Sequence, residues 1–322
     1  MKICTITCSN TDNHGARLQT YALAKYLQEQ GNDVSVIDYR PPYMDPTFRV
    51  FYWPGLSIKE WAKFFLRFPQ RIQSKKRHKN FVAFSKKYLP LTEKVYRCIQ
   101  DLRQDPPCAD IYIAGSDQIW NTFFPNGTDP AFYLDFGPES IRRESFAASF
   151  ATTELRSGTE EFVRTHLARF DKISVREESG LDLLHRLGLH GGIREDDPVF
   201  LLSAGQWDDL ADKTGYGEHY LLVYDFFSDR RIKKTAKAIA KSRHLKIYSV
   251  CPVWSAYANR NYMTVGPESF VALVRNATCV VTNSFHAIAF CFIFQRNYVF
   301  VERPDGLNER ITALLKRQVN PA

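Results

Sequence analysis

The chain has 322 residues, of which 44% are hydrophobic and 24% charged, and its formal net charge at neutral pH is +8. This composition excludes a disordered or low-complexity protein, and the length suffices for two domains of ordinary size. The longest apolar run, residues 287–294, is too short to span a membrane. The first eight residues are too short and too polar for a signal peptide, so we expect a cytoplasmic protein.

Strand-like and helix-like segments alternate from the start of the chain. Residues 3–7 predict a strand, residues 16–30 a helix that ends before Gly31, and residues 34–39 a second strand. A β-α-β opening of this kind predicts a parallel sheet. Further strands are predicted at 111–114, 146–150 and 172–175, and further helices at 159–170 and 179–187.

A domain boundary is expected near Asp196-Asp197-Pro198, which follows the flexible pair Gly191-Gly192. After it the strand–helix rhythm restarts, with strands at 220–224 and 246–250 and helices at 231–243 and 267–276. We therefore predict an α/β protein with two Rossmann-like, doubly wound domains that face a cleft. Residues 1–195 form the first domain, with a basic helical insertion at about 50–105, and residues 196–322 form the second.

The positive charge is concentrated in one segment. From Lys59 to Lys94 eleven Lys and Arg accompany only two Glu, so this segment carries +9 and the rest of the chain sums to −1. Aromatic residues recur within it at helical spacing, as in a helix with one buried face. Three interpretations of this segment compete. A solvated helical face is favoured, a surface for anionic lipid comes second, and a nucleic-acid surface comes last.

Seven residues near the C-terminus carry the strongest chemical signal, Thr282-Asn283-Ser284-Phe285-His286-Ala287-Ile288. The apolar segment 279–281 precedes them and another, 289–294, follows, which predicts a strand, a polar turn and a buried helix. Ligands of open α/β sheets bind where strands end, and a helix N-terminus attracts anions. His286 is therefore a candidate acid/base residue; the alternative is a core or capping histidine.

Six motifs along the chain resemble those of a known family. They are residues 13–23 (NHGARLQTYAL), 114–121 (AGSDQIWN), 145–150 (SFAASF), 174–177 (SVRE), 197–198 (DP) and 282–286 (TNSFH). With these motifs, in this order, the chain resembles the polysaccharide pyruvyl transferases over most of its length. The resemblance implies a GT-B-like fold, phosphoenolpyruvate as the donor substrate, and a sugar or lipid-linked oligosaccharide as the acceptor. The implied product is a cyclic pyruvate ketal on a surface polysaccharide.

The resemblance also assigns roles to residues. Arg176 would bind the carboxylate or phosphate of phosphoenolpyruvate, since a planar guanidinium suits either group; the alternative is an ion pair with Glu177 or Glu178. His286 would protonate the methylene carbon of the donor. Arginines and helix N-termini would neutralise the phosphate, so no metal and no further cofactor is expected.

Other positions are expected to bind substrate. They are Asn13, His14, Gly15, Gly115, Ser116, Asp117, Gln118, Asn283, Ser284, Phe285 and Arg310. Asp117 would cap a helix or accept a hydrogen bond from the sugar, and Gln118, Trp120 and Asn121 are of types common in sugar-binding surfaces. Relatives often carry an arginine two residues before the histidine, where this chain has Ser284; Arg17, Arg303 and Arg310 are candidates to replace it.

Two other functions stay open at the level of sequence. A GT-B glycosyltransferase that uses a nucleotide sugar would have the same architecture, and a relative that binds phosphoenolpyruvate or glycan without turnover would keep most of the motifs. The Lys59–Lys94 segment would let the protein contact the inner face of an anionic membrane, where lipid-linked glycans are built. No nucleic-acid partner is expected.

Overall fold

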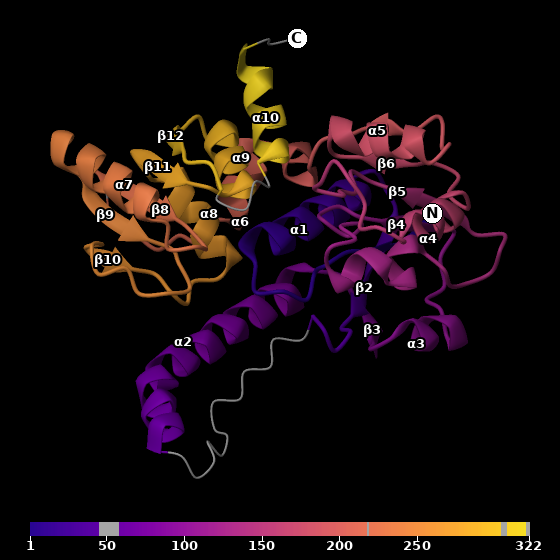
Figure 1. The fold of residues 1–322 in the computed structure, drawn as a ribbon, viewed down its shortest axis with the longest axis horizontal. Coiled ribbons are helices and arrows are strands. Elements are labelled where there is room, and N and C mark those ends of the chain that lie inside the picture. Colours follow the sequence, from indigo (N-terminus) through magenta and orange to yellow (C-terminus); the bar gives the residue numbers. More distant parts are fainter. Residues whose placement is uncertain (45–57, 218, 304–307, 320–322) are drawn as a thin grey trace. The chain divides into compact units, whose positions relative to one another are not determined.

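The computed structural model describes residues 1–44, 58–217, 219–303 and 308–319 (Figure 1). Contacts divide the chain into two compact units, each described separately below. Unit 1 comprises the described parts of Met1–Asp45, Tyr88–Ser203 and Arg303–Ala322, and unit 2 those of Pro46–Lys87 and Ala204–Glu302. No helix among the described residues is both long and apolar enough to cross a membrane.

This division departs from the expected one in two segments. The basic segment was expected in the first domain, but up to Lys87 it groups with unit 2. The reason is local: Arg77 donates to the backbone oxygen of Met263 at 3.3 Å, and Asn80 donates to that of Thr264 at 2.6 Å. The residues from Arg303 onward return to unit 1, where Arg310 approaches Asp117.

Unit 1 is built on a parallel five-stranded sheet with the order β3-β2-β1-β4-β5. Its strands are β1 Lys2–Ile6, β2 Asp33–Tyr39, β3 Leu91–Tyr96, β4 Ile111–Ala114 and β5 Arg142–Ser145. A two-stranded parallel sheet, β6 Ser174–Val175 and β7 Ile193–Arg194, follows, and a bridge between Ala148 and Val175 extends the main sheet toward it. Residues 146–150, expected as a strand, are instead the turn that follows β5.

Side chains that alternate along the strands of unit 1 fill two separate cores. Ile3, Ile111 and Ile113 belong to a cluster with Leu23 of helix α1 (His14–Glu29), whereas their neighbours Tyr112 and Ala114 belong to a larger cluster. Because successive side chains of a strand point to opposite faces, both faces of this sheet are buried. Such strands appear in a sequence as continuous apolar runs, as residues 111–114 do.

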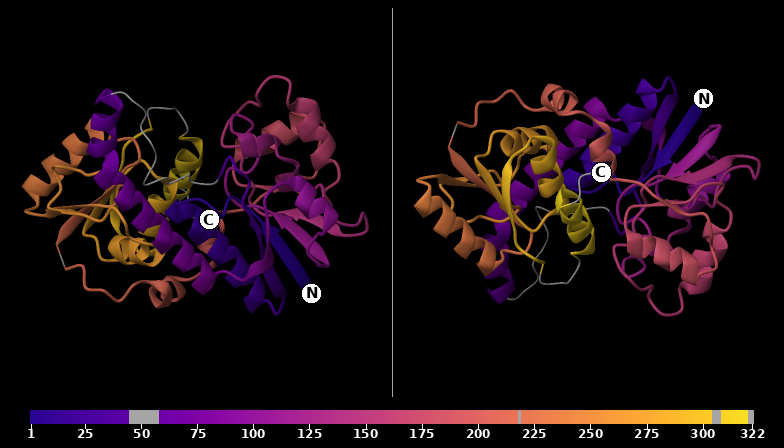
Figure 2. Two further views of the ribbon diagram at one scale, coloured as in Figure 1. Left: turned by 90° about the horizontal axis from the view of Figure 1, so that it is seen from below. Right: turned by 90° about the horizontal axis from the view of Figure 1, so that it is seen from above.

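Unit 2 repeats the same topology. Its parallel sheet has the order β10-β9-β8-β11-β12, in which β8 and β11 are the central pair. The strands are β8 Tyr220–Tyr224, β9 Lys246–Ser249, β10 Arg260–Asn261, β11 Cys279–Thr282 and β12 Asn297–Phe300. Figure 2 shows the strands of each unit side by side in a twisted layer flanked by helices. The prediction of two α/β units with parallel sheets is therefore confirmed.

Helices lie between the strands along the chain, except α10, which follows the last strand. In unit 1 they are α1 His14–Glu29, α3 Ile99–Gln104, α4 Glu160–Leu167, α5 Glu178–Arg186 and α10 Glu309–Val319, and in unit 2 they are α6 Ala204–Leu210, α7 Arg230–Ser242, α8 Pro267–Arg275 and α9 Phe285–Ile293. Helix α2, Ile58–Tyr88, is the basic segment. Short 3₁₀ turns lie at Pro125–Thr128, Pro130–Tyr133 and Pro198–Leu201.

Candidate functional site

The turn after β4 lies at the carboxyl edge of the first sheet and requires a glycine. Gly115 has φ +118°, and a Cβ on it would lie 2.4 Å from the backbone oxygen of Phe146. Several hydrogen bonds hold Ser116: its hydroxyl donates to the backbone oxygen of Ala147 at 2.5 Å, its backbone oxygen accepts from Thr7 Oγ1 at 2.6 Å, and its backbone N–H donates to Gln19 Oε1 at 3.2 Å. The turn is thus fixed against the neighbouring strand ends.

Arg176 reaches this turn from the end of β6. It is 5% exposed, and its Nη2 lies 2.5 Å from Ser116 Oγ and 2.9 Å from Asp197 Oδ2. The ion-pair partner seen here is therefore Asp197, not Glu177 or Glu178 as the alternative supposed. The Glu177 carboxylate is also buried and accepts from Ser149 Oγ at 2.9 Å and from the backbone N–H of Ala151 at 2.8 Å.

A second buried arginine joins this cluster from helix α10. Arg310 is 8% exposed, and its Nη1 lies 3.6 Å from Asp117 Oδ1. Burial, followed by the charge of Arg176, lowers the pKa of Arg310 to about 10. Since a guanidinium with this pKa stays charged at neutral pH, two buried guanidinium groups lie beside the carboxylates of Asp117, Glu177 and Asp197. A phosphate or a carboxylate is the kind of ligand that such planar groups can bind with two parallel hydrogen bonds.

The side-chain contacts of the loop before α1 stabilise the start of that helix. Asn13 is the N-cap, because its Oδ1 accepts from the backbone N–H groups of Gly15 at 2.9 Å and Ala16 at 3.3 Å. His14 is completely buried. Arg17, a candidate to replace the arginine that is absent at position 284, donates from Nε to the backbone oxygen of Thr11 at 3.1 Å, and burial lowers its pKa to about 10.

The interpretation of Trp120 and Asn121 as sugar-binding types was wrong, since both side chains are buried. Trp120 has no exposed surface, packs on Tyr133 and Phe150, and donates from Nε1 to the backbone oxygen of Phe132 at 3.0 Å. Gln118, by contrast, is half-buried beside Asp117. Composition alone misled here because an indole suits a core as well as a sugar.

The corresponding turn of unit 2 carries His286, as the pattern predicted. It joins β11 to the apolar helix α9, with Ser284 as the N-cap that accepts from the backbone N–H of Ala287 at 3.5 Å. Asn283 donates from Nδ2 to Asp225 Oδ1 at 3.1 Å. His286 is 8% exposed, and its ring lies 5.2 Å from that of Phe285 at nearly a right angle. The second turn is thus held by amide and hydroxyl groups.

Three carboxylates were missed as site residues. Asp197 and Glu177 lie in motifs already noted, and Asp225 directly follows the apolar strand β8. The general rule that polar residues at strand ends gather at one edge of a parallel sheet would have found Asp225. Pairing of Asp197 with Arg176 has no signal in sequence spacing. Within the described ranges, no group of three or more His, Cys, Asp or Glu side chains is arranged to hold a metal ion.

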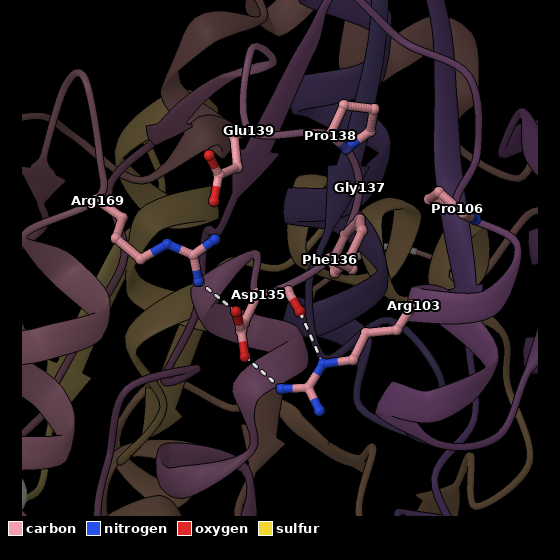
Figure 3. A pocket seen from close by; sticks show the side chains of 8 residues that line it. All are labelled: Arg103, Pro106, Asp135, Phe136, Gly137, Pro138, Glu139 and Arg169. Carbon is pink, nitrogen blue, oxygen red and sulfur yellow. Dashed lines mark hydrogen bonds and ion pairs between the residues drawn. The ribbon is translucent and has the colours of Figure 1, made fainter.

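A pocket of about 370 Å³ lies elsewhere in unit 1, among segments that precede strands (Figure 3). Arg103 and Arg169 flank Asp135 and both pair with it. The adjoining loop is held by Arg143, whose buried guanidinium donates to the backbone oxygens of Leu134, Phe136, Pro138, Glu139 and Ile141. The charged side chains are thus used to hold the loop, and the pocket is at the amino edge of the sheet, away from the candidate site.

Two parallel-sheet units with polar turns at their carboxyl edges define an α/β protein built to bind substrate at strand ends. A model of the family described as polysaccharide pyruvyl transferase matches residues 13–303. The chain belongs to this family and is a transferase. A search of curated proteins finds no match.

Solved structures with similar arrangements have low sequence identity. A putative UDP-N-acetylglucosamine 2-epimerase from Listeria monocytogenes is 11% identical, with 99% of this chain and 88% of that chain covered and a TM-score of 0.49. The UDP-GlcNAc 2-epimerase from Neisseria meningitidis is 12% identical, with coverages of 100% and 92% and a TM-score of 0.47. The E. coli heptosyltransferase WaaC is 11% identical, with coverages of 99% and 100% and a TM-score of 0.42.

Proposed function

We propose that the protein transfers the enolpyruvyl group of phosphoenolpyruvate onto two hydroxyls of a sugar and forms a pyruvate ketal in surface-polysaccharide biosynthesis. The observation that carries the proposal is the pair of buried arginines, Arg176 and Arg310, at the strand ends of unit 1. Phosphoenolpyruvate bears both a phosphate and a carboxylate, and bidentate pairing with guanidinium groups suits each of them. In this proposal the two guanidinium groups, and not a metal ion, bind the anionic groups of the donor.

The reaction starts with a proton on the methylene carbon of phosphoenolpyruvate, which becomes a methyl group. The adjacent carbon gains oxocarbenium character, and one sugar hydroxyl adds to it and loses its proton. Phosphate then leaves with the electrons of its C–O bond, and a second hydroxyl adds, loses its proton and closes the ketal. We assign the proton transfers to His286, since an imidazole can give and take protons near neutral pH.

A thermal-shift titration with phosphoenolpyruvate tests the donor site. We expect a stabilising shift in the native protein and a much smaller one in Arg176→Lys, which keeps the charge beside Asp197 but loses the planar fork. Arg142→Lys, at an exposed ion pair with Glu144, is the matched control and should retain the shift. An undiminished shift in Arg176→Lys would place the donor elsewhere.

The same titration, together with an assay of phosphate release, separates the alternatives. Stabilisation by UDP and none by phosphoenolpyruvate would favour a glycosyltransferase that uses a nucleotide sugar. Binding of phosphoenolpyruvate without phosphate release, across a panel of glycans, would favour a non-catalytic relative. The proposed function requires that phosphate is released only when an acceptor is present.

We further propose that helix α2 contacts an anionic membrane surface, where a lipid-linked acceptor would be held. The side chains of residues 58–60 and 62–67 lie outside the described part. In the remainder, Lys75, Lys76 and Lys79 are exposed on one face while Phe81 and Phe84 are buried on the other. Each exposed lysine near an anionic surface contributes about 1 kcal/mol to binding.

Pelleting with phosphatidylglycerol vesicles tests this contact. Reversal of the three charges, Lys75/Lys76/Lys79→Glu, should abolish co-sedimentation at low salt. The control reverses three exposed lysines of α7, Lys234/Lys237/Lys241→Glu, and should keep binding. Equal loss in both variants would mean that only net charge matters, and absence of binding in the native protein would refute the contact.

A further inference from the structure

A second pocket, of about 250 Å³, lies at the carboxyl edge of the sheet in unit 2. It is formed by the loop that follows β8 and the loop that follows the neighbouring strand β9. Its lining includes Asp225, Lys233, Trp254, Ser255 and Tyr257. This is the edge at which open parallel sheets bind their ligands, and nothing in the proposed chemistry of the donor uses it.

Polar groups line the pocket and are held in place. The buried Asp225 carboxylate accepts from the backbone N–H groups of Phe227 at 2.8 Å and Asp229 at 2.7 Å. Ser255 Oγ lies 3.1 Å from Ser249 Oγ. Burial raises the pKa of Tyr257 to about 12, so its phenol stays protonated and can donate a hydrogen bond at neutral pH. The lining thus offers both donors and acceptors.

The two loops that form the pocket also expose large apolar side chains. Trp254 is 66% exposed, and Phe226, Phe227 and Val253 on the same two loops are exposed as well. A cluster of exposed large apolar residues on a soluble surface marks a binding site more often than an isolated one does. A flat indole beside fixed hydroxyl and carboxyl groups matches a pyranose ring, which has an apolar C–H face and a rim of hydroxyls.

The volume of the pocket and the charges of its lining limit which ligands it can bind. Pockets for drug-sized molecules measure roughly 300–1,000 Å³, so this one suits a single ring. Asp225 and Asp229 line it together with Arg230 and Lys233, so the charges balance. A lining without net charge matches a neutral ring with hydroxyls.

We propose that this pocket is the subsite for a pyranose ring of the acceptor glycan. That the bound sugar is an acceptor rests on the proposed function, whereas the binding of a pyranose does not. The pocket is linked to the turn that carries His286, because Asp225 Oδ1 also accepts from Asn283 Nδ2. The Oδ1 atom of Asn283 is buried and makes no hydrogen bond within the described residues, which leaves an acceptor at this edge of the sheet.

Saturation-transfer difference NMR tests the proposal on the full chain without phosphoenolpyruvate. The probes are methyl β-D-glucopyranoside, methyl β-D-galactopyranoside and methyl α-D-mannopyranoside, each at millimolar concentration. We expect at least one to bind the native protein, and Trp254→Ala to weaken its binding about tenfold. Trp254→Phe keeps an aromatic plane and should restore most of the affinity, and Phe123→Ala, at an exposed aromatic residue of unit 1, should not change it.

Three outcomes would overturn the assignment, and a fourth would overturn the proposed function alone. Absence of binding to all three pyranosides would refute it, as would binding that Trp254→Ala leaves intact. A response to UDP that requires Trp254, with none to the pyranosides, would assign the pocket to a nucleotide. If pyranosides bind through Trp254 but phosphate is never released from phosphoenolpyruvate, the sugar site stands and the proposed function fails.

Discussion

The turns after β4 and β11 occupy the same position in two sheets of identical strand order, yet they hold different chemistry. In unit 1 the turn Gly115–Asp117 lies among buried charges, with Arg176 at Ser116 and Arg310 near Asp117. In unit 2 the turn Asn283–His286 carries an amide and a hydroxyl: Asn283 donates to the buried carboxylate of Asp225, and Ser284 caps helix α9. The topology decides where a ligand can bind, and the side chains decide which ligand it is.

The difference has an energetic side. Buried charges are expensive unless they are paired, so the first turn depends on fixed partners such as Asp197 and becomes rigid. At the second turn the buried carboxylate of Asp225 accepts hydrogen bonds from the Asn283 amide and from backbone N–H groups, which are neutral partners. The contrast suits one turn to hold an anion and the other to move protons.

The largest expected effect comes from removing the imidazole of the second turn. His286→Gln should lower kcat for phosphate release by a factor of about 10²–10⁴, the usual contribution of a general acid or base. Binding of phosphoenolpyruvate, measured by thermal shift, should stay close to that of the native protein. His190→Gln, at an exposed histidine of unit 1, is the control. Full turnover in His286→Gln would show that the second turn does not supply the proton donor.

A substitution at Gly115 tests how strictly the turn after β4 requires a glycine. Gly115→Ala should destabilise the protein by about 2–4 kcal/mol, because the positive φ and the contact with Phe146 both oppose a Cβ. Gly158→Ala is the matched control: it also has a positive φ, but nothing lies within 4 Å of its Cβ position, so about 1–2 kcal/mol is expected. Urea denaturation measures the free energy of unfolding of both variants. Equal losses of stability would mean that the close contact between Gly115 and the backbone of Phe146 is not required.

A substitution at Arg310 tests whether both buried arginines of unit 1 bind the donor. Arg310→Ala should weaken phosphoenolpyruvate binding roughly 10–100-fold, as expected for the loss of a charge-assisted hydrogen bond worth about 1.5–3 kcal/mol. Isothermal titration calorimetry gives the affinity, and Arg186→Ala, at an exposed arginine of α5, serves for comparison. Unchanged affinity would assign the anion to Arg176 alone.

The smallest effect is expected at Ser284. Ser284→Ala removes the N-cap of α9 and should cost about 0.5–1 kcal/mol of stability, near the low end because the hydrogen bond is long. Donor affinity should not change if the arginines of unit 1 hold the phosphate. A marked loss of donor affinity in this variant would show that the second turn also binds the anion.

The parts of the fold that were predictable have continuous apolar strands. Residues 111–114 and 220–224 match β4 and β8 to the residue, because strands buried on both faces leave an uninterrupted signal. Strand β3 was missed because its sequence, Leu-Thr-Glu-Lys-Val-Tyr, is polar and mostly exposed at an edge. The short edge strands β10 and β12 were missed as well.

The candidate site was predictable where motif and strand end coincide. His286 and the turn at Gly115–Asp117 were found for this reason. The meeting of Arg310 with Asp117 depends on a contact between residues 193 positions apart, which no local pattern records. Trp120 was misjudged because its residue type was weighed without the packing of Tyr133 and Phe150 around it.

The return of the last helix to unit 1 has a consequence for synthesis. Arg310 joins Asp117 only after the whole of unit 2 has been translated, because the residues from Arg303 onward follow it in the chain. A nascent chain that stops after unit 2 therefore lacks one of the two buried cations. For the same reason no single cut separates the units into two intact halves, and an attempt to express either one alone must join segments that are distant in the gene.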